Sequence, residues 1–346
     1  MARPLVILNG RGKGKKRDEG VEHPKKYTVD KCYGHLHKGF ELFIDDQPLL
    51  EHIINAYGKL TDGNGCKLFS PIYIAGPRQL HAKWAPYYNR NLVRLIHTNR
   101  PLHENLRRVG IILKKLHADE MTVIQPSDVV PSPEDLEAFV EQVLRADAEE
   151  IDSLMPIVNP ESLKAIGVKK PEYSIHDKQG EVFTYSWGQV YALRPSRMRW
   201  GVLQAGARIG YRERAGAFRQ NLWKRRNIAR FILSLGRPMN WPMIPFLLKN
   251  AKEYADKIRF GEITFDEAEY GAEQMLMRHP LGKDRDPKMR VWYSDHGTLA
   301  ADVDGQSDLI ALARAMGAES CEDDLRKYSF TSDAFLDGGS PGAGAP

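Results

Sequence analysis

Short hydrophobic runs alternate with longer segments of mixed polarity through the first 150 residues. Each run is only four or five residues long, and two of them end at a Gly-Pro or Gln-Pro pair. Apolar runs of this length between turn residues are typical of buried strands. We therefore expect strands at Leu5–Leu8, Pro71–Ala75, Leu92–Ile96 and Met121–Ile124.

Helices are expected between these strands. Pro48 suits the first turn of a helix, and an amphipathic pattern predicts another helix over about 102–117. Ser132, followed three residues later by Asp135, resembles the capping box that begins a helix. Strands separated by helices are typical of right-handed crossovers, so these residues predict an α/β fold with a mostly parallel sheet.

The rest of the chain departs from this alternation. We expect extended segments over 151–195, with turns at 178–180 and 187–188, and then helices rich in aromatic residues and proline over 215–280. A further strand is expected over 291–303 and a closing helix over 308–316. Residues 336–346 are of low complexity and are predicted to be disordered.

The composition is that of a soluble globular protein, with 42% hydrophobic and 27% charged residues among 346. The cysteines Cys32, Cys66 and Cys321 form no CxxC pair, which excludes a disulfide framework and a typical zinc site. The apolar run at 5–8 is too short for the core of a signal peptide. We therefore expect a cytoplasmic protein.

The formal net charge of +5 hides an uneven distribution. Residues 11–38 hold nine Lys and Arg against four acids, and residues 194–230 hold eleven against Glu213 alone. Basic residues concentrated in this way repel one another unless a polyanion binds to them. The charge pattern therefore predicts a polyanionic partner.

A glycine-rich basic loop follows the first strand, with the sequence Asn9-Gly10-Arg11-Gly12-Lys13-Gly14-Lys15-Lys16. Glycines let backbone amides approach a phosphate chain, and the basic side chains supply countercharge. The spacing matches neither a P-loop nor a dinucleotide-binding fingerprint. The loop is thus a candidate phosphate-binding loop, with a basic loop that binds no ligand as the alternative.

Three aspartates are candidates for a metal site. Asp128 lies just past the expected strand at 121–124, where open α/β sheets bind ligands, although an ordinary turn aspartate is the alternative. Alternation in a strand would place Asp302 and Asp304 on one face, where their repulsion calls for a cation. Asp308 fits a structural role in the first turn of the last helix.

The order of these motifs resembles the GT-A-type nucleotidyltransferases, and most of all the MobA-like NTP transferase group. Members of this group join a nucleoside monophosphate to a phosphorylated sugar, polyol or cofactor precursor. The motifs are Asn9–Lys13, Lys38 with Asp45–His52, Ser127-Asp128 with Pro131, and Asp302–Leu309. The resemblance covers about 1–150 and 290–316, and extends more faintly through 152–158 and 180–193.

The resemblance implies a GT-A, Rossmann-like fold, with a mostly parallel mixed sheet flanked by helices and a helical insertion. It implies a nucleotidyltransferase-like domain over 1–335, ahead of the tail 336–346. Within it we expect the nucleotide-binding half at 1–150 and the acceptor-side half at 151–214. The helical insertion is expected at 215–285, and the return strand with its closing helix at 286–320.

It also implies site residues. Catalytic roles fall on Arg11, Lys13, Lys38 and Asp128. Nucleotide binding falls on Leu8, Asn9, Gly10, Gly12, Asn105 and Ser127. Contact with the acceptor falls on Gly188 and Gln189, and Mg²⁺ binding on Asp128, Asp304 and Asp302.

The arginine-rich segment and the apolar run after it, 218–248, allow three interpretations. Prolines interrupt the run, so it is not a membrane-spanning helix. It is a core insertion with a solvated basic face, an acceptor pocket in which Lys224 or Arg225 grips a phosphate, or a surface that contacts an anionic membrane. No nucleic-acid-binding signature is present, so nucleic acid is not an expected partner.

The sequence therefore predicts a Mg²⁺-dependent nucleotidyltransferase that binds a nucleoside triphosphate and a phosphorylated small-molecule acceptor and releases pyrophosphate. An acceptor phosphate is already an anion, so alignment and charge neutralisation are required rather than a general base. One alternative is a GT-A glycosyltransferase that uses a nucleotide-sugar. Another is a catalytically degenerate member that binds a polyanion or a membrane surface. The oligomeric state is not predicted.

Overall fold

The computed structural model describes residues 2–9, 37–84, 92–98, 102–204, 243–278 and 288–318. The strands are β1 (Arg3–Leu8), β2 (Phe43–Ile44), β3 (Gln47–Pro48), β4 (Phe69–Gly76), β5 (Val93–His97), β6 (Thr122–Pro126), β7 (Ser153–Val158), β8 (Tyr173–His176), β9 (Val182–Trp187), β10 (Tyr191–Leu193) and β11 (Met289–Ser294). The α-helices are α1 (Lys38–Glu41), α2 (Leu49–Lys59), α3 (Arg78–Trp84), α4 (Leu102–Leu116), α5 (Pro133–Ala148), α6 (Pro160–Ala165), α9 (Met243–Phe260), α10 (Phe265–Leu276) and α11 (Gln306–Ala315). Two 3₁₀ turns are η2 (Pro195–Arg197) and η3 (Gly297–Leu299).

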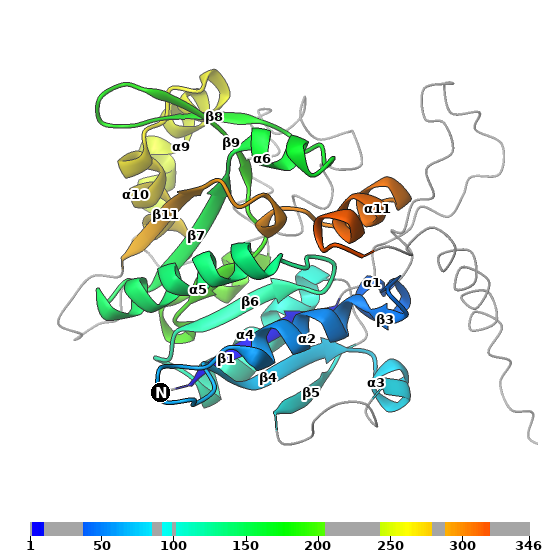
Figure 1. Cartoon of the computed structure of the whole chain (residues 1–346). Coiled ribbons are helices and arrows are strands. Elements are labelled where there is room, and N and C mark those ends of the chain that lie inside the picture. The colour runs from blue at the N-terminus through cyan, green and yellow to red at the C-terminus, as the bar shows by residue number, and fades with distance from the viewer. Residues whose placement is uncertain are drawn as a thin grey trace, which may run out of the picture.

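A mixed sheet of nine strands forms the centre of the described fold (Figure 1). Its order is β5-β4-β1-β6-β10-β7-β9-β8, and β11 pairs with β7. The strands β5, β4, β1 and β6 are parallel, as the alternating pattern of the first 150 residues predicts. β10 and β9 run antiparallel to β7 and pair with its two ends, whereas β11 runs parallel to it. The α/β fold class with a mixed sheet is thus confirmed.

The register of the parallel strands brings three chain segments to one edge of the sheet. Leu8, the last residue of β1, lies opposite Ala75 of β4 and Pro126 of β6. Because parallel strands end at the same edge, the residues that follow them are neighbours in space. Asn9 and Ser127 therefore lie side by side, and the Ser127 amide donates to the Leu8 carbonyl at 2.9 Å.

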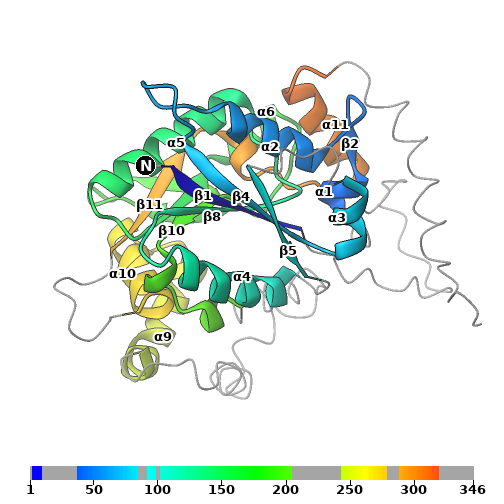
Figure 2. The same cartoon turned by 90° about the horizontal axis from the view of Figure 1, so that it is seen from below.

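Helices cover both faces of the sheet (Figure 2). α2, α5 and α11 pack on one face, and their apolar side chains share a core cluster with alternate residues of β1, β4 and β6. α4 and α10 contribute to a second cluster on the other face. In β1, Leu5 and Ile7 belong to the first cluster and Val6 and Leu8 to the second. This strand is buried on both faces, which explains its unbroken apolar sequence.

Two expectations in the second half need correction. The stretch at 151–195 contains a helix, α6, which begins because the Asn159 side chain accepts a hydrogen bond from the Glu161 amide at 3.1 Å and Pro160 occupies the first turn. The strand expected over 291–303 ends at Ser294. Asp302 lies outside that strand, in an isolated bridge to Val129, because η3 turns the chain in between.

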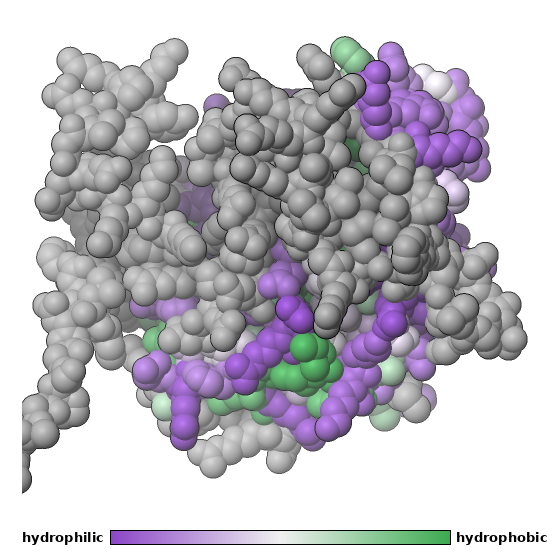
Figure 3. Space-filling model, turned by 180° about the vertical axis from the view of Figure 1, so that it is seen from behind, coloured by the Kyte–Doolittle hydropathy of each residue, from purple (hydrophilic) through white to green (hydrophobic). Residues whose placement is uncertain are grey.

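The hydropathy of one face and of the described helices bears on the membrane contact expected for part of this chain. On the face seen in Figure 3, hydrophilic residues surround a small hydrophobic area. None of the helices in the described ranges combines the length and the apolar composition that crossing a bilayer requires. The segment 218–248, proposed as a membrane contact, lies outside the described residues except for the backbone of 243–248.

The position of α4 on the sheet depends on a glycine. A Cβ at Gly110 would lie 2.1 Å from the ring of Trp200, and this ring is anchored by a 3.0 Å hydrogen bond from its Nε1 to the Pro195 carbonyl. Only a glycine lets the helix approach the indole so closely. The same helix carries Asn105, so this contact also sets the place of a predicted site residue.

Replacing Gly110 with alanine is expected to lower the free energy of unfolding by about 1–3 kcal/mol, because an added methyl group overpacks the contact with Trp200. Gly58→Ala is the matched control. Gly58 also lies in a helix, but a Cβ there would meet only the Leu92 side chain, at an ordinary 3.4 Å. Urea denaturation of both variants tests this, and equal stability of the two would contradict the account of α4 packing.

Candidate functional site at the carboxyl edge of the sheet

Asn9 connects three elements at the carboxyl edge of the sheet. Its side-chain Oδ1 accepts a 2.8 Å hydrogen bond from the Ser127 hydroxyl, and its backbone carbonyl accepts a 3.3 Å bond from Asn105 Nδ2. The backbone amide of Asn9 donates to the Ala75 carbonyl at 2.9 Å. The end of β1 is thus tied to the loop after β6, to α4 and to β4.

The short helix α1 lies directly against this network. A Cβ at Gly39 would lie 2.5 Å from Ser127 Cβ and 3.3 Å from Asn9 Oδ1, so only glycine allows the approach. Lys38, the residue before Gly39, is consequently held at the edge of the sheet beside Asp128. Close backbone approach is the reason for a glycine at this position.

Three carboxylates converge at the same edge. One oxygen from each of Asp128, Asp302 and Asp304 lies within 4.8 Å of the others. The Val303 amide donates to the Asp128 carbonyl at 3.1 Å, and Asp302 forms a bridge with Val129, so the two loops run side by side. The convergence predicted from strand alternation is therefore present, but it arises from loop pairing.

Asp308 has the structural role expected of it. Its Oδ2 accepts hydrogen bonds from the Asp304 amide at 3.0 Å and from the Gly305 amide at 2.9 Å. These bonds cap the start of α11 and fix the backbone of Asp304. The cap thereby positions a carboxylate of the cluster.

Two lysines neutralise part of this negative charge. Lys38 Nζ lies 2.8 Å from Asp128 Oδ2 and 2.7 Å from Asp304 Oδ1, so it bridges two carboxylates. Lys170 Nζ contacts Asp302 Oδ1. The Asp302 side chain is only 5% exposed, whereas that of Asp304 is 48% exposed. The cluster therefore has a buried carboxylate, Asp302, on one side and an accessible one, Asp304, on the other.

The electrostatic environment keeps Lys38 charged. Burial by itself lowers the pKa of its ammonium group, but the nearby carboxylates of Asp128 and Asp304 outweigh this effect. The pKa of Lys38 is consequently raised above its ordinary value. Lys38 therefore stays protonated at physiological pH and acts as a fixed positive charge.

The carboxylate cluster fits a divalent cation of the kind that prefers oxygen ligands. Carboxylates are the ligands that Mg²⁺ uses in proteins, and these three converge on one point at the end of a central strand. The Lys38 ammonium between Asp128 and Asp304 shows that these two oxygens already share a cation. The donor set is therefore compatible with Mg²⁺.

Among the predicted site residues that the structure describes, most lie together. Hydrogen bonds join the side chains of Ser127 and Asn105 to Asn9, at its side chain and its backbone carbonyl respectively. The side chains of Lys38, Asp128, Asp302 and Asp304 form a second group. Leu8 is 3% exposed, so it lines this edge only through its backbone. The remaining predictions in the basic loop and the arginine-rich segment lie outside the described residues: Gly10, Arg11, Gly12, Lys13, Lys224 and Arg225.

Gly188 and Gln189 lie next to this edge and are held by their backbone. The Gly188 amide donates to the Pro156 carbonyl at 3.1 Å, and a Cβ there would lie 2.5 Å from that same oxygen. The Gln189 amide donates to the Leu299 carbonyl at 2.9 Å, in the segment that leads to Asp302. Packing explains the glycine, and a role for either residue in acceptor binding stays a prediction.

Lys170 is a site residue that sequence analysis missed. It lies in a loop between α6 and β8, in the sequence Lys169-Lys170-Pro171, which matches no motif. Its partner Asp302 is 132 positions away in the chain, so only the tertiary structure reveals the pair. No local signal could have distinguished Lys170 from Lys169.

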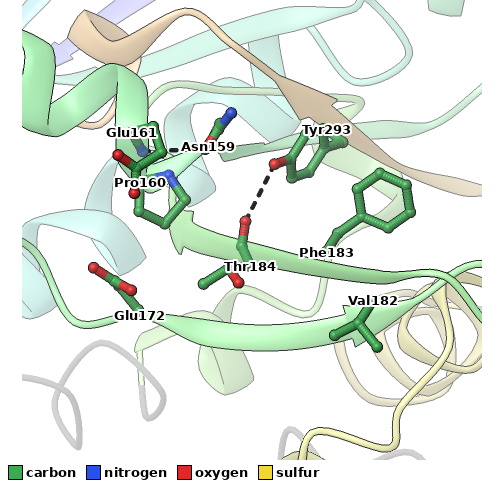
Figure 4. A pocket seen from close by; sticks show the side chains of 8 residues that line it. All are labelled: Asn159, Pro160, Glu161, Glu172, Val182, Phe183, Thr184 and Tyr293. Carbon is green, nitrogen blue, oxygen red and sulfur yellow. Dashed lines mark hydrogen bonds between the residues drawn. The ribbon is translucent and has the colours of Figure 1, made fainter.

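A cleft lies elsewhere, between α6, β9 and β11 (Figure 4). It encloses about 210 Å³ and is lined by Asn159, Pro160, Glu161, Glu172, Val182, Phe183, Thr184 and Tyr293. The Tyr293 hydroxyl crosses it to donate to the Thr184 carbonyl at 3.2 Å. None of the predicted site residues that the structure describes lines this cleft, so the carboxylate cluster remains the candidate functional site.

Comparison with solved structures identifies chains of the same fold. The chain superposes on a hypothetical transferase from Thermus thermophilus with a TM-score of 0.50 and 17% sequence identity, over 89% of this chain and 100% of that one. The two chains share one fold. The Rossmann-like α/β fold expected from the resemblance to nucleotidyltransferases is thus confirmed.

Named nucleotidyltransferases are also among the matched structures. The 4-diphosphocytidyl-2C-methyl-D-erythritol synthase of Anaerococcus prevotii matches with a TM-score of 0.42 and 11% identity, over 92% of this chain and 97% of that one. A CMP:2-keto-3-deoxy-manno-octonic acid synthetase complexed with CTP matches with a TM-score of 0.44 and 9% identity, over 91% and 98%. No family model matches the sequence, and no curated protein matches it.

Replacing Lys170 with methionine is expected to lower the free energy of unfolding by about 3–5 kcal/mol, because it leaves the buried Asp302 carboxylate without its countercharge. Lys164→Met is the matched control. Lys164 pairs with Glu161 and Glu172 while its side chain is 49% exposed, and ion pairs this exposed to solvent add little to stability. Denaturant unfolding measures both changes, and a Lys170 variant as stable as the Lys164 variant would refute the role of Lys170.

Proposed function

We propose that the protein is a Mg²⁺-dependent nucleotidyltransferase that transfers a nucleoside monophosphate from a nucleoside triphosphate to a phosphorylated small-molecule acceptor, with release of pyrophosphate. One observation carries the proposal. The carboxylates of Asp128, Asp302 and Asp304 converge within 4.8 Å beside Lys38, at the end of central parallel strands. Ligands of open α/β sheets bind at this edge.

The arrangement suits phosphoryl chemistry. Asp128, Asp304 and Asp302 would hold Mg²⁺, which supplies neutralisation of phosphate charge when it is bound. Lys38 supplies a permanent positive charge for the departing pyrophosphate, and its backbone is fixed by the contact of Gly39 with Ser127. Arg11 and Lys13 of the basic loop would add further positive charge. An acceptor phosphate is already an anion and needs alignment rather than deprotonation.

A neutral compartment beside the charged one suits the nucleobase. His81 Nε2 and Thr98 Oγ1 are buried and have no hydrogen-bond partner among the described residues. Both border Gly76, because the Thr98 amide donates to its carbonyl at 2.7 Å and a Cβ there would lie 2.9 Å from His81 Nε2. Burial, and to a smaller extent His97, lowers the pKa of His81 to about 4, so this side chain is neutral at physiological pH.

Neutral hydrogen-bonding groups of this kind match the edge of a base rather than a phosphate. Asn9 connects the two compartments, because its Oδ1 faces Ser127 and a Cβ at Gly76 would lie 3.5 Å from its Nδ2. We therefore assign the base to the side of Gly76, Thr98 and Asn105, and the triphosphate to the side of Lys38 and Asp128.

The function is tested by measuring pyrophosphate released from each of the four nucleoside triphosphates, with Mg²⁺ and a panel of sugar and polyol phosphates. We expect release with one preferred triphosphate. Asp128→Asn should reduce the rate on the order of 10²–10⁴-fold, because it removes a metal carboxylate. Glu161→Gln, in the separate cleft, is the control and should retain the rate.

Two results would contradict the proposal. Transfer from a nucleotide-sugar without pyrophosphate release would identify the glycosyltransferase alternative. Unchanged polyanion binding by Asp128→Asn, with no turnover by the natural chain on any triphosphate, would identify a degenerate binding protein.

Thr98→Val tests the base compartment. Removing the hydroxyl should weaken binding of the preferred triphosphate by about tenfold, the equivalent of one hydrogen bond. The stability of the ligand-free protein should stay equal or rise, because the hydroxyl is buried without a partner among the described residues. Calorimetric titration and thermal unfolding give both values. Unchanged affinity for every triphosphate would place the base elsewhere.

A further inference from the structure

The two lysines of the carboxylate cluster differ in the exposure of the carboxylates that they contact. Lys170 pairs with Asp302, and both side chains are nearly buried, at 14% and 5% exposure. Lys38 bridges Asp128 and Asp304, and the Asp304 side chain is 48% exposed. Water and small ions can therefore reach the Asp304 carboxylate but hardly reach that of Asp302, although the Lys38 side chain itself is only 11% exposed.

The charges of the cluster do not balance. Among the described residues, three carboxylates face two ammonium groups, so the charges of these five side chains sum to −1. A divalent cation that joined the cluster with Lys38 still in place would reverse this sign. The Lys38 ammonium also lies between an oxygen of Asp128 and an oxygen of Asp304, two of the three carboxylates that would hold such a cation. A divalent cation and the Lys38 ammonium therefore compete for the same carboxylates.

Lys38 can leave these oxygens without movement of the backbone. Its main chain is held because Gly39 packs against Ser127, but its side chain is a flexible four-carbon stem. A swing of the stem would move the ammonium from the carboxylates to an anion bound at the same edge. The long side chain thus permits an exchange of partners.

We propose that Lys38 is an exchangeable internal cation that makes the site bind a divalent cation and a polyphosphate as a pair, and each of them poorly alone. This inference rests on the proposed function for the identity of the two ligands. A cation alone leaves the Lys38 ammonium partly buried without an anion, which is costly. A polyphosphate alone meets Lys38 already engaged and three carboxylates that repel it. The polyphosphate gives the displaced Lys38 ammonium an anion, and the divalent cation releases Lys38 and offsets the carboxylate charge that repels the polyphosphate. Binding of either ligand therefore strengthens binding of the other, and such coupling is reciprocal.

The test measures binding to the full chain with simple probes, without acceptor or turnover. Binding of Mn²⁺ alone is followed by electron paramagnetic resonance for the natural chain, Lys38→Met and Lys164→Met. Binding of inorganic tripolyphosphate with chelator, and of the preformed Mn²⁺–tripolyphosphate complex, is followed by calorimetry. The solution formation constant of the complex, measured in the same buffer, closes the thermodynamic cycle.

For the natural chain we expect the complex to bind at least about tenfold more tightly than either component alone, within the usual range of coupling. Lys38→Met should bind Mn²⁺ alone about tenfold more tightly than the natural chain and should lose affinity for the complex. Lys164→Met should match the natural chain in both respects. Equal affinity of the natural chain and Lys38→Met for Mn²⁺ alone would overturn the proposal.

A second readout covers poor folding of the variant. Removing Lys38 leaves Asp128 and Asp304 facing each other, so Lys38→Met should unfold at a lower temperature in chelator and recover with Mn²⁺. If Lys38→Met does not fold, Lys38→Gln replaces it in the comparison of unfolding temperatures with chelator and with Mn²⁺. The glutamine amide still donates a hydrogen bond but carries no charge. A variant stabilised by Mn²⁺ no more than the natural chain would contradict the exchange.

The outcomes separate the two proposals. Coupled binding of Mn²⁺ and tripolyphosphate without pyrophosphate release from any triphosphate would refute the proposed function and leave the exchange standing. Pyrophosphate release together with equal Mn²⁺ affinity of the natural chain and Lys38→Met would refute the exchange and leave the function standing.

Discussion

The ion pairs of Lys38 connect the parts of the chain on which the candidate site depends. Lys38 meets Asp128, 90 positions later, and Asp304, 266 positions later, through one ammonium group. These distances in sequence are possible because β1 and β6 end at the same edge and the segment after η3 returns to pair with Val129. The fold therefore brings together charges that would repel one another if the cation were absent.

The surrounding packing serves this arrangement. Gly39 lets α1 touch Ser127, Asn9 joins β1 to that serine, and the cap formed by Asp308 fixes the backbone of Asp304. Each contact limits the freedom of one charged residue before a ligand arrives. Such preorganisation is what electrostatic catalysis requires, because groups already in place need no reorganisation during the reaction.

A division by charge runs along the same edge. The carboxylates and lysines lie on one side of Asn9, and the neutral groups of His81 and Thr98 lie on the side of Gly76. A nucleoside triphosphate has the same division between its phosphates and its base. This correspondence links the proposed function to the electrostatics of the site as well as to the fold.

Much of this could be predicted from the sequence, and the exceptions have physical reasons. The buried strand at 5–8 and the cap at Ser132 follow local rules, and Asp128 follows from its place after a parallel strand. Strand alternation predicts that Asp302 and Asp304 converge, and their carboxylates do lie close together, but it is the pairing of their loop with Val129 that brings them there. Lys170, His81 and Thr98 depend on contacts between distant segments, which no periodicity records.

A crystal structure with a non-hydrolysable nucleoside triphosphate analogue and Mn²⁺ tests the central claim most directly. The account predicts an anomalous Mn²⁺ peak coordinated by Asp128 and Asp304, the Lys38 ammonium moved onto phosphate oxygens, and the base beside Thr98. A Lys38 ammonium that remains between Asp128 and Asp304, with the nucleotide or the Mn²⁺ bound elsewhere, would contradict it.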